Sequence, residues 1–136
     1  MARVLVWAVF VLLLATSSFA APLNLKDYPD RAEVTVTAYT NILECTKKGD
    51  PNTTASMLKI ERLHYRRLVA LSRDLASRFK FGQRFYLVVG GKVFDVEFQD
   101  IMNKKHRNKI DLLLGSKREC LEFGVKKGTL VPIRWE

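Results

Sequence analysis

Two aspartates, Asp100 and Asp111, lie on either side of a strongly basic loop, and each is at the edge of an apolar segment. A carboxyl group on the apolar side of a strand is partly removed from water, which raises its pKa toward the range of a general acid. The cationic side chains between the two act in the opposite direction, because positive charge stabilises a carboxylate. From the residues alone, the pair is either an acid/base site or two carboxylates in solvated surface ion pairs.

The segments that would carry these aspartates alternate between apolar and polar residues, as β-strands do. Gly90 and Gly91 lie between two such segments, which indicates a tight hairpin. Ser116 can cap a short helix that ends at Gly124, and one helical turn is expected over residues 74–79. The predicted strands are residues 33–40, 68–71, 84–89, 92–99, 110–114 and 128–135. Six short strands with one or two short helices favour a mostly β, small closed barrel over a parallel sheet with crossover helices.

Alternation also predicts the face on which Asp100 lies. In the segment 92–99, Phe94, Val96 and Phe98 share one face. By the same parity, Asp100 continues this apolar face. If the strands 92–99 and 110–114 are neighbours, Asp100 and Asp111 reach the same end of the barrel.

The first twenty residues are typical of a cleaved secretory signal. Arg3 precedes an apolar run over residues 4–15, and the small residues Ser18 and Ala20 suit signal peptidase cleavage before Ala21. A membrane-spanning helix needs about 20 apolar residues, so this run is too short to be an anchor. We therefore expect a signal peptide (1–20), an N-terminal arm (21–31) and one barrel domain (32–136). The mature chain would be periplasmic or extracellular, associated with the cell envelope and without stable membrane insertion.

Export also bears on the two cysteines, Cys45 and Cys120. Thiols pair in oxidising compartments, so a disulfide between them is expected, and two separate buried thiols are the alternative. The two histidines, His64 and His106, lie far from either cysteine and show no metal-ligand spacing. The sequence therefore predicts no metal site and no cofactor.

The chain is basic, with a formal net charge of +9. Cleavage of the signal peptide would remove Arg3 and lower this charge by one. Such a charge implies polyanionic surroundings. An exported protein rarely meets nucleic acid, so bacterial envelope polymers, acidic glycans and anionic lipid surfaces are the better match. No nucleic-acid partner is expected, and the sequence carries no signal for an oligomeric state.

Six segments in a fixed order resemble the bacterial 3D domain, which is named for its three aspartates. The order of the segments and the spacing between the second and third aspartates make the resemblance specific. The resemblance runs from about residue 33 to 135. The segments are residues 37–40, 68–75, 81–87, 99–105, 108–112 and 120–124.

The resemblance implies a six-stranded double-psi β-barrel and a peptidoglycan-cleaving activity. The family includes membrane-bound lytic transglycosylase A and stationary-phase secreted muralytic proteins. These enzymes cleave the β-1,4 bond between N-acetylmuramic acid and N-acetylglucosamine and leave a 1,6-anhydro ring. The resemblance gives Asp111 the acid/base role and Asp100 a supporting role. Asp74 is the candidate first aspartate, or else a helix cap.

The remaining candidate site residues would contact the glycan. Tyr39 is either a sugar-binding aromatic at the barrel mouth or a core residue. The basic loop is equally well interpreted as a solvent-exposed loop or as one that contacts the glycan. His106 within it is expected to be a surface residue. The loop residues considered for substrate binding are Lys104, Lys105 and Arg107.

The sequence departs from the family pattern at two places, which motivates a second interpretation. Ser72 stands where many members carry an aspartate, and residues 101–103 replace a Gly-Gly loop. A barrel that binds wall glycan, or a protein partner, without cleaving it is therefore the alternative. A basic adhesin or toxin-like module acting on nucleic acid or membranes is a third interpretation.

Overall fold

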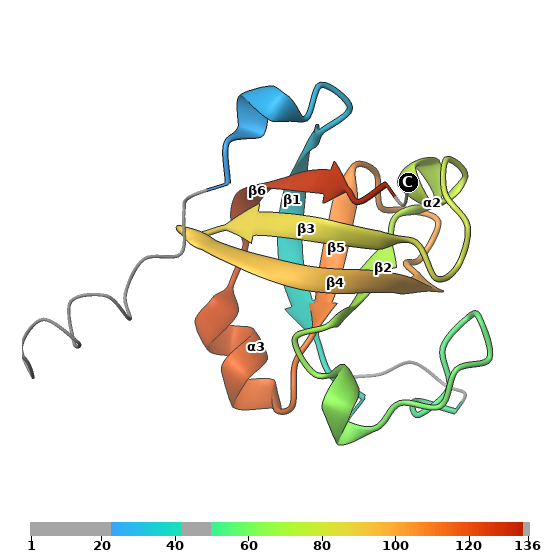
Figure 1. The fold of residues 1–136 in the computed structure, drawn as a ribbon. Helices are drawn as coiled ribbons and strands as arrows, with labels where there is room; N and C mark the ends of the chain where they lie inside the picture. Colours follow the sequence, from blue (N-terminus) through green and yellow to red (C-terminus); the bar gives the residue numbers. More distant parts are fainter. Residues whose placement is uncertain (1–22, 42–49, 135–136) are drawn as a thin grey trace, which may run out of the picture.

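The computed structural model describes residues 23–41 and 50–134. Six strands form a closed barrel in the order β1-β5-β2-β4-β3-β6 (Figure 1). The fold is mostly β, as predicted. The strands are β1 (Ala32–Tyr39), β2 (Leu68–Leu71), β3 (Arg84–Val89), β4 (Lys92–Ile101), β5 (Lys109–Leu113) and β6 (Lys126–Pro132). The helices are η1 (Leu25–Asp27), η3 (Arg62–His64), α2 (Arg73–Ala76) and α3 (Lys117–Phe123).

The barrel mixes parallel and antiparallel pairs. β1 pairs with β5 and β2 pairs with β4 in parallel, and the other neighbours are antiparallel. β4 and β5 are therefore not neighbours, because β2 lies between them. The sequence leaves open whether these two strands are neighbours, and in the structure the single strand β2 separates them.

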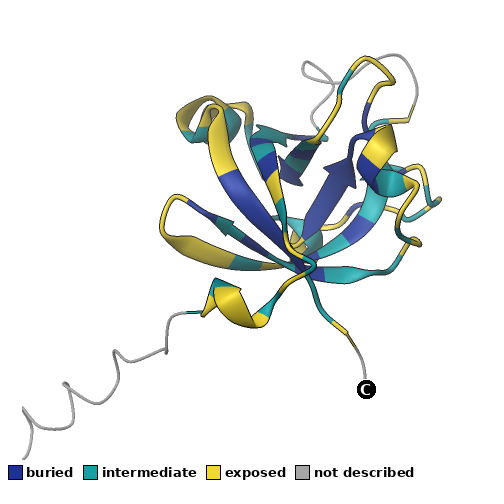
Figure 2. Cartoon of the chain, turned by 90° about the horizontal axis from the view of Figure 1, so that it is seen from above, coloured by how far each residue is buried: buried dark blue, intermediate teal, exposed yellow. Residues whose placement is uncertain are grey.

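The core fills the inside of the barrel with the inward residues of every strand. Val36, Val69, Phe85, Leu87 and Ile110 are each completely buried in it. Figure 2 shows the buried residues running along the strands, with exposed residues on the loops, the hairpin and the helices. Alternation along β-branched and aromatic residues thus specifies which face of each strand is covered.

Two local predictions are confirmed by backbone geometry. Gly90 and Gly91 have φ values of 58° and 73°, the left-handed conformation that a tight hairpin turn needs between β3 and β4. The Ser116 side chain accepts a hydrogen bond from the backbone N–H of Glu119 and caps α3. Gly124, with φ 67°, ends that helix.

A β-bulge in β4 changes the face on which Asp100 lies. Val69 of β2 pairs with Phe98, but the next residue, Ala70, pairs with Asp100, so Gln99 is the extra residue. Phe98 points into the core, and Asp100 lies beside Ala70 on the outer face of the barrel. The parity argument that placed Asp100 on the face of Phe98 is wrong, because alternation fails across a bulge.

Residues 58–65, which precede β2, pack against the outside of the barrel. Of these, Leu58, Ile60 and Tyr65 form a second apolar cluster with the outward side chains of Leu68 and Leu113. This packing covers part of the outer face beside the bulge.

Two predictions concern residues outside the described ranges: the signal peptide (1–20) and Cys45, one of the two cysteines of the expected disulfide. Within the described residues, no helix combines the length and the apolar character that crossing a bilayer requires.

Candidate functional site

One row of paired residues crosses four neighbouring strands and brings the two aspartates together. Thr37 of β1 pairs with Asp111 of β5, Asp111 pairs with Ala70 of β2, and Ala70 pairs with Asp100 of β4. Paired residues of neighbouring strands project to the same face of a sheet. The carboxyl groups therefore share the outer face, with the small side chain of Ala70 between them in the row.

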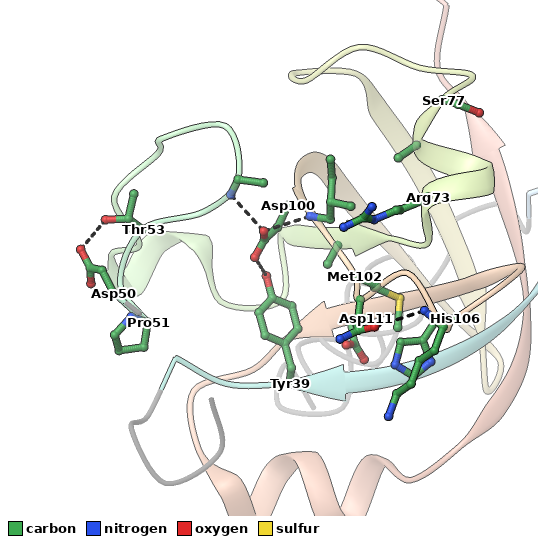
Figure 3. Close-up of a pocket in the computed structure, with 16 residues that line it drawn as sticks. Tyr39, Asp50, Pro51, Thr53, Arg73, Ser77, Asp100, Met102, His106 and Asp111 are labelled. Atoms are coloured by element: carbon green, nitrogen blue, oxygen red, sulfur yellow. Dashed lines mark hydrogen bonds between the residues drawn. The ribbon is translucent and has the colours of Figure 1, made fainter. Parts of the chain in front are cut away.

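Three residues of this row, Asp111, Ala70 and Asp100, form the floor of an open groove of about 980 Å³. One wall is formed by residues 50–55, which precede β2, and the other is α2 (Figure 3). The loop between β4 and β5 closes one end. The walls and the loop contribute Asp50, Pro51, Thr53, Ala55, Arg73, Ala76, Ser77, Ile101, Met102, Asn103, Lys105 and His106.

Asp111 is half-buried on the groove floor and accepts a hydrogen bond from the Thr37 hydroxyl. Burial raises the pKa of the Asp111 carboxyl, and the negative charge of Asp100 acts in the same direction. The Thr37 hydrogen bond and the positive charges of His106 and Lys109 act against this, but the pKa remains above its ordinary value. The protonated form of Asp111 is thus favoured at a higher pH than for an exposed aspartate.

Asp100 is held by three hydrogen bonds from three parts of the chain. The Tyr39 hydroxyl donates to Oδ2 at 3.2 Å, and the backbone N–H groups of Ala55 and Ile101 donate to Oδ1 at 3.0 and 2.9 Å. Burial, followed by the charge of Asp100, raises the pKa of Tyr39, so this hydroxyl stays protonated and donates. Asp100 therefore joins the groove floor to the wall that contains Ala55.

The β-bulge takes part in the same junction. The backbone N–H of Ser56 donates to the carbonyl oxygen of the bulged residue Gln99 at 3.2 Å. Together with the bond from Ala55 to Asp100, this contact fixes the wall to the bulged part of β4. The bulge thus turns Asp100 outward and also provides an acceptor for the wall.

Asp74 is not among the residues that line the groove. Its carboxylate accepts a hydrogen bond from the backbone N–H of Asn108 at 2.9 Å, and the Ser72 hydroxyl oxygen accepts one from Lys109 at 3.1 Å. A hydrogen bond from Ser72 lowers the pKa of Asp74, as does the bond from Asn108. These contacts hold the chain at the start of β5, two residues before Asp111.

The other sequence candidates divide between groove and surface. Tyr39 and Lys105 line the groove, whereas Lys104 and Arg107 are exposed and are not among its lining residues. His106, expected to be a surface residue, is partly buried and lines the groove beside Asp111.

Sequence reasoning missed Thr37 and Arg73. Thr37 could have been found, because it precedes Tyr39 by two positions in a strand and so shares its face. Arg73 had no local signal, since it reaches the groove through the placement of α2.

The predicted roles of Cys45 and Cys120 as a disulfide stay a prediction, because Cys45 lies outside the described residues. Among the described residues, no group of three or more histidine, cysteine, aspartate or glutamate side chains is arranged to hold a metal ion.

The comparison with solved structures identifies the fold. The Streptomyces papain inhibitor aligns with a TM-score of 0.54 at 19% identity, covering 79% of this chain and 97% of the inhibitor. Expansin of Clavibacter michiganensis aligns with a TM-score of 0.55 at 13% identity, covering 78% of this chain and 52% of the expansin. This chain thus spans about half the length of the expansin. Both are double-psi barrels, as the resemblance implied for this chain, and the fold prediction is confirmed.

MltA from E. coli also aligns, with 15% identity over 65% of this chain and 29% of MltA, but its TM-score of 0.44 is too low to show a common fold. No protein-family model matches the chain, and no curated protein matches its sequence. Membership of the 3D-domain family therefore stays a prediction.

Proposed function

We propose that this protein is an exported peptidoglycan-cleaving enzyme. Its reaction would be that of a lytic transglycosylase, which breaks the β-1,4 bond between N-acetylmuramic acid and N-acetylglucosamine and leaves a 1,6-anhydro end. The observation that carries the proposal is the Asp111 carboxyl group, which lies on the floor of an open groove with its pKa raised by burial.

Asp111 has the properties needed of a general acid. A carboxyl group that stays protonated can donate its proton to the glycosidic oxygen as the bond from that oxygen to C1 breaks. The C6 hydroxyl of the same muramyl ring then attacks C1, and its proton passes to the Asp111 carboxylate. One carboxyl group therefore completes the reaction, without the pair of catalytic carboxylates that hydrolytic glycosidases use.

Thr37 and Asp100 support the two protonation states of Asp111. The Thr37 hydroxyl donates to Asp111 and so stabilises the carboxylate left after the first proton transfer. Asp100, held in place by Tyr39, Ala55 and Ile101, provides a negative charge that favours return of the proton. We assign Asp74 a positioning role, because its carboxylate binds the chain before β5 and does not line the groove.

The fold and the charge fit a glycan substrate. The expansin that shares this fold was solved in complex with cellohexaose, at 16% identity and a TM-score of 0.52. A protein that contains a barrel of this kind therefore binds a β-1,4-linked glycan, which supports a glycan as the ligand proposed here. The net charge of +9 suits an anionic wall polymer, and export to the envelope would bring the two together.

Release of soluble fragments from purified sacculi tests the role of Asp111. We expect the protein to solubilise sacculi and Asp111→Asn to lose at least about a hundredfold in rate, because the amide cannot donate an acidic proton. Asp95→Asn is the matched control, since Asp95 is exposed and pairs with Arg84 away from the groove. Full activity of folded Asp111→Asn would refute the assignment.

A glycan-binding barrel without cleavage is the second candidate. It is favoured by Asp100, whose oxygen atoms are taken up by three hydrogen bonds, as in a structural carboxylate. It is also favoured by residues 101–103, which replace the Gly-Gly loop at the groove end. Co-sedimentation with sacculi, without any soluble fragment between acid and neutral pH, would support this candidate.

A further inference from the structure

The charges that line the groove are distributed unevenly between its two walls. The wall before β2 carries Asp50, whereas α2 and the loop after β4 carry Arg73, Lys105 and His106. Figure 3 shows Arg73 extending from α2 toward the groove, on the side away from Asp50 and Thr53. A glycan bound over Asp111 would therefore have cationic side chains along one side.

The acidic groups of the groove already have partners within the protein. Asp50 accepts hydrogen bonds from the Thr53 hydroxyl at 2.6 Å and from the Asn52 backbone at 2.9 Å. Asp100 is satisfied by the three bonds described above. Asp111 accepts a hydrogen bond from the Thr37 hydroxyl, and burial favours its neutral form.

Two cationic side chains of the groove, by contrast, lack acidic partners among the described residues. Neither Arg73 nor Lys105 forms an ion pair with any residue in the ranges 23–41 and 50–134. Both side chains are exposed and line the groove. Arg73 and Lys105 are therefore the rim side chains available to pair with a negative group of a ligand.

We propose that Arg73, together with Lys105, recognises a carboxylate on the glycan and makes the groove selective for acidic over neutral β-1,4 glycans. This inference rests on the proposed function of the groove as a glycan site. The planar guanidinium of Arg73 matches a carboxylate through two parallel hydrogen bonds, a geometry that an ammonium group lacks. Arg73 is therefore the principal determinant, and Lys105 adds charge.

The position of the free carboxylate in a peptide-free muramyl glycan agrees with this arrangement. Its lactyl ether is on C3 of the same ring whose bond at C1 would be broken over Asp111. A cation that contacts this group must therefore lie within about one sugar of the acid, and Arg73 and Asp111 line the same groove. Neutral β-1,4 glycans, such as chitin oligosaccharides, have no group for Arg73 to bind.

Equilibrium binding to soluble glycans tests the inference. The probes are peptide-free muramyl glycan strands, a chitin oligosaccharide and a uronic-acid oligosaccharide, all of matched length. Binding is measured in the Asp111→Asn background so that no probe is consumed. We expect muramyl strands to bind about fivefold tighter than the chitin oligosaccharide at low salt, with the preference decreasing as salt screens the charges.

Arg73→Gln should abolish this preference, whereas Arg62→Gln should keep it, since Arg62 is also exposed but does not line the groove. Equal binding of the uronic-acid oligosaccharide, lost in Arg73→Gln, would also support carboxylate recognition and would widen the substrate class. Equal affinity for acidic and neutral glycans, or a preference that survives Arg73→Gln, would overturn the inference.

The outcome can be separated from that of the proposed function. If sacculi are cleaved by the unmodified protein but acidic and neutral glycans bind equally, the inference about Arg73 fails alone. If the Arg73-dependent preference holds but no fragments are released, the proposed cleavage fails and carboxylate recognition stands.

Discussion

At the scale of single residues, the site depends on how two aspartates in one row are treated differently by their surroundings. Asp111 receives one side-chain hydrogen bond, from Thr37, and its burial favours the protonated form. Asp100 receives three hydrogen bonds, from Tyr39, Ala55 and Ile101. The row therefore holds one carboxyl group suited to donate a proton beside another that is fixed in place by three donors.

The raised pKa of Asp111 predicts how stability depends on pH. A carboxyl group with a folded-state pKa above its ordinary 3.8 binds more protons in the folded than in the unfolded state. Its contribution to the free energy of unfolding therefore falls as pH rises from 3.8 through the folded-state pKa. Asp111→Asn removes this cost. We expect its free energy of unfolding, relative to the unmodified protein, to be higher at neutral pH than below pH 3.8. Urea unfolding at both pH values measures this, and a difference independent of pH would contradict it.

Tyr39 supplies a second prediction at this scale. Tyr39→Phe removes the donor to Asp100 Oδ2 and leaves a partly buried carboxylate oxygen without that bond. We expect a loss of about 1 kcal/mol in the free energy of unfolding, together with reduced activity. Tyr86→Phe is the control, because Tyr86 is in β3 and does not line the groove. An equal effect of the two substitutions would show that the bond to Asp100 contributes nothing specific.

At the scale of elements, the strands and their inward faces could be predicted from the sequence, but the site could not be assembled from them. Alternation identified the six strands, and Gly90 and Gly91 identified the hairpin. The bulge at Gln99 has no local sequence signal, and it determines the face of Asp100. The groove walls depend on long-range packing, such as that of Ile60 on Leu68, which neither alternation nor propensity specifies.

The hydrogen bonds of Asp74 and Ser72 at the start of β5 yield a prediction about this strand. Hydrogen bonds lower the pKa of Asp74 below 3.8, so its contribution to stability is present above that value and is lost as pH falls through the folded pKa. We expect Asp74→Ala to be destabilised at neutral pH and to approach the unmodified protein in acid. Thermal unfolding across this range measures the effect. If the substitution instead left stability unchanged at neutral pH, the bond to Asn108 would not hold β5 in place.

At the scale of the whole molecule, the barrel closes through β6, which pairs with both β1 and β3. A Cβ atom at Gly128 would lie 2.8 Å from the Val36 side chain and 2.9 Å from the Val88 carbonyl oxygen. We expect Gly128→Ala to cost about 1–3 kcal/mol in the free energy of unfolding, because backbone must move to admit a methyl group. Lys127→Ala, an exposed change on the same strand, should cost under about 0.5 kcal/mol. Similar values for the two would show that closure tolerates the added atom.

Mass analysis of the fragments released from sacculi tests the central claim, that the Asp111 groove performs a lytic cleavage without water. Attack by the C6 hydroxyl gives muropeptides that are one water lighter than the products of hydrolysis. We predict these anhydro ends from the unmodified protein and their absence with Asp111→Asn. Fragments with hydrated reducing ends, or no fragments from a folded protein, would contradict it.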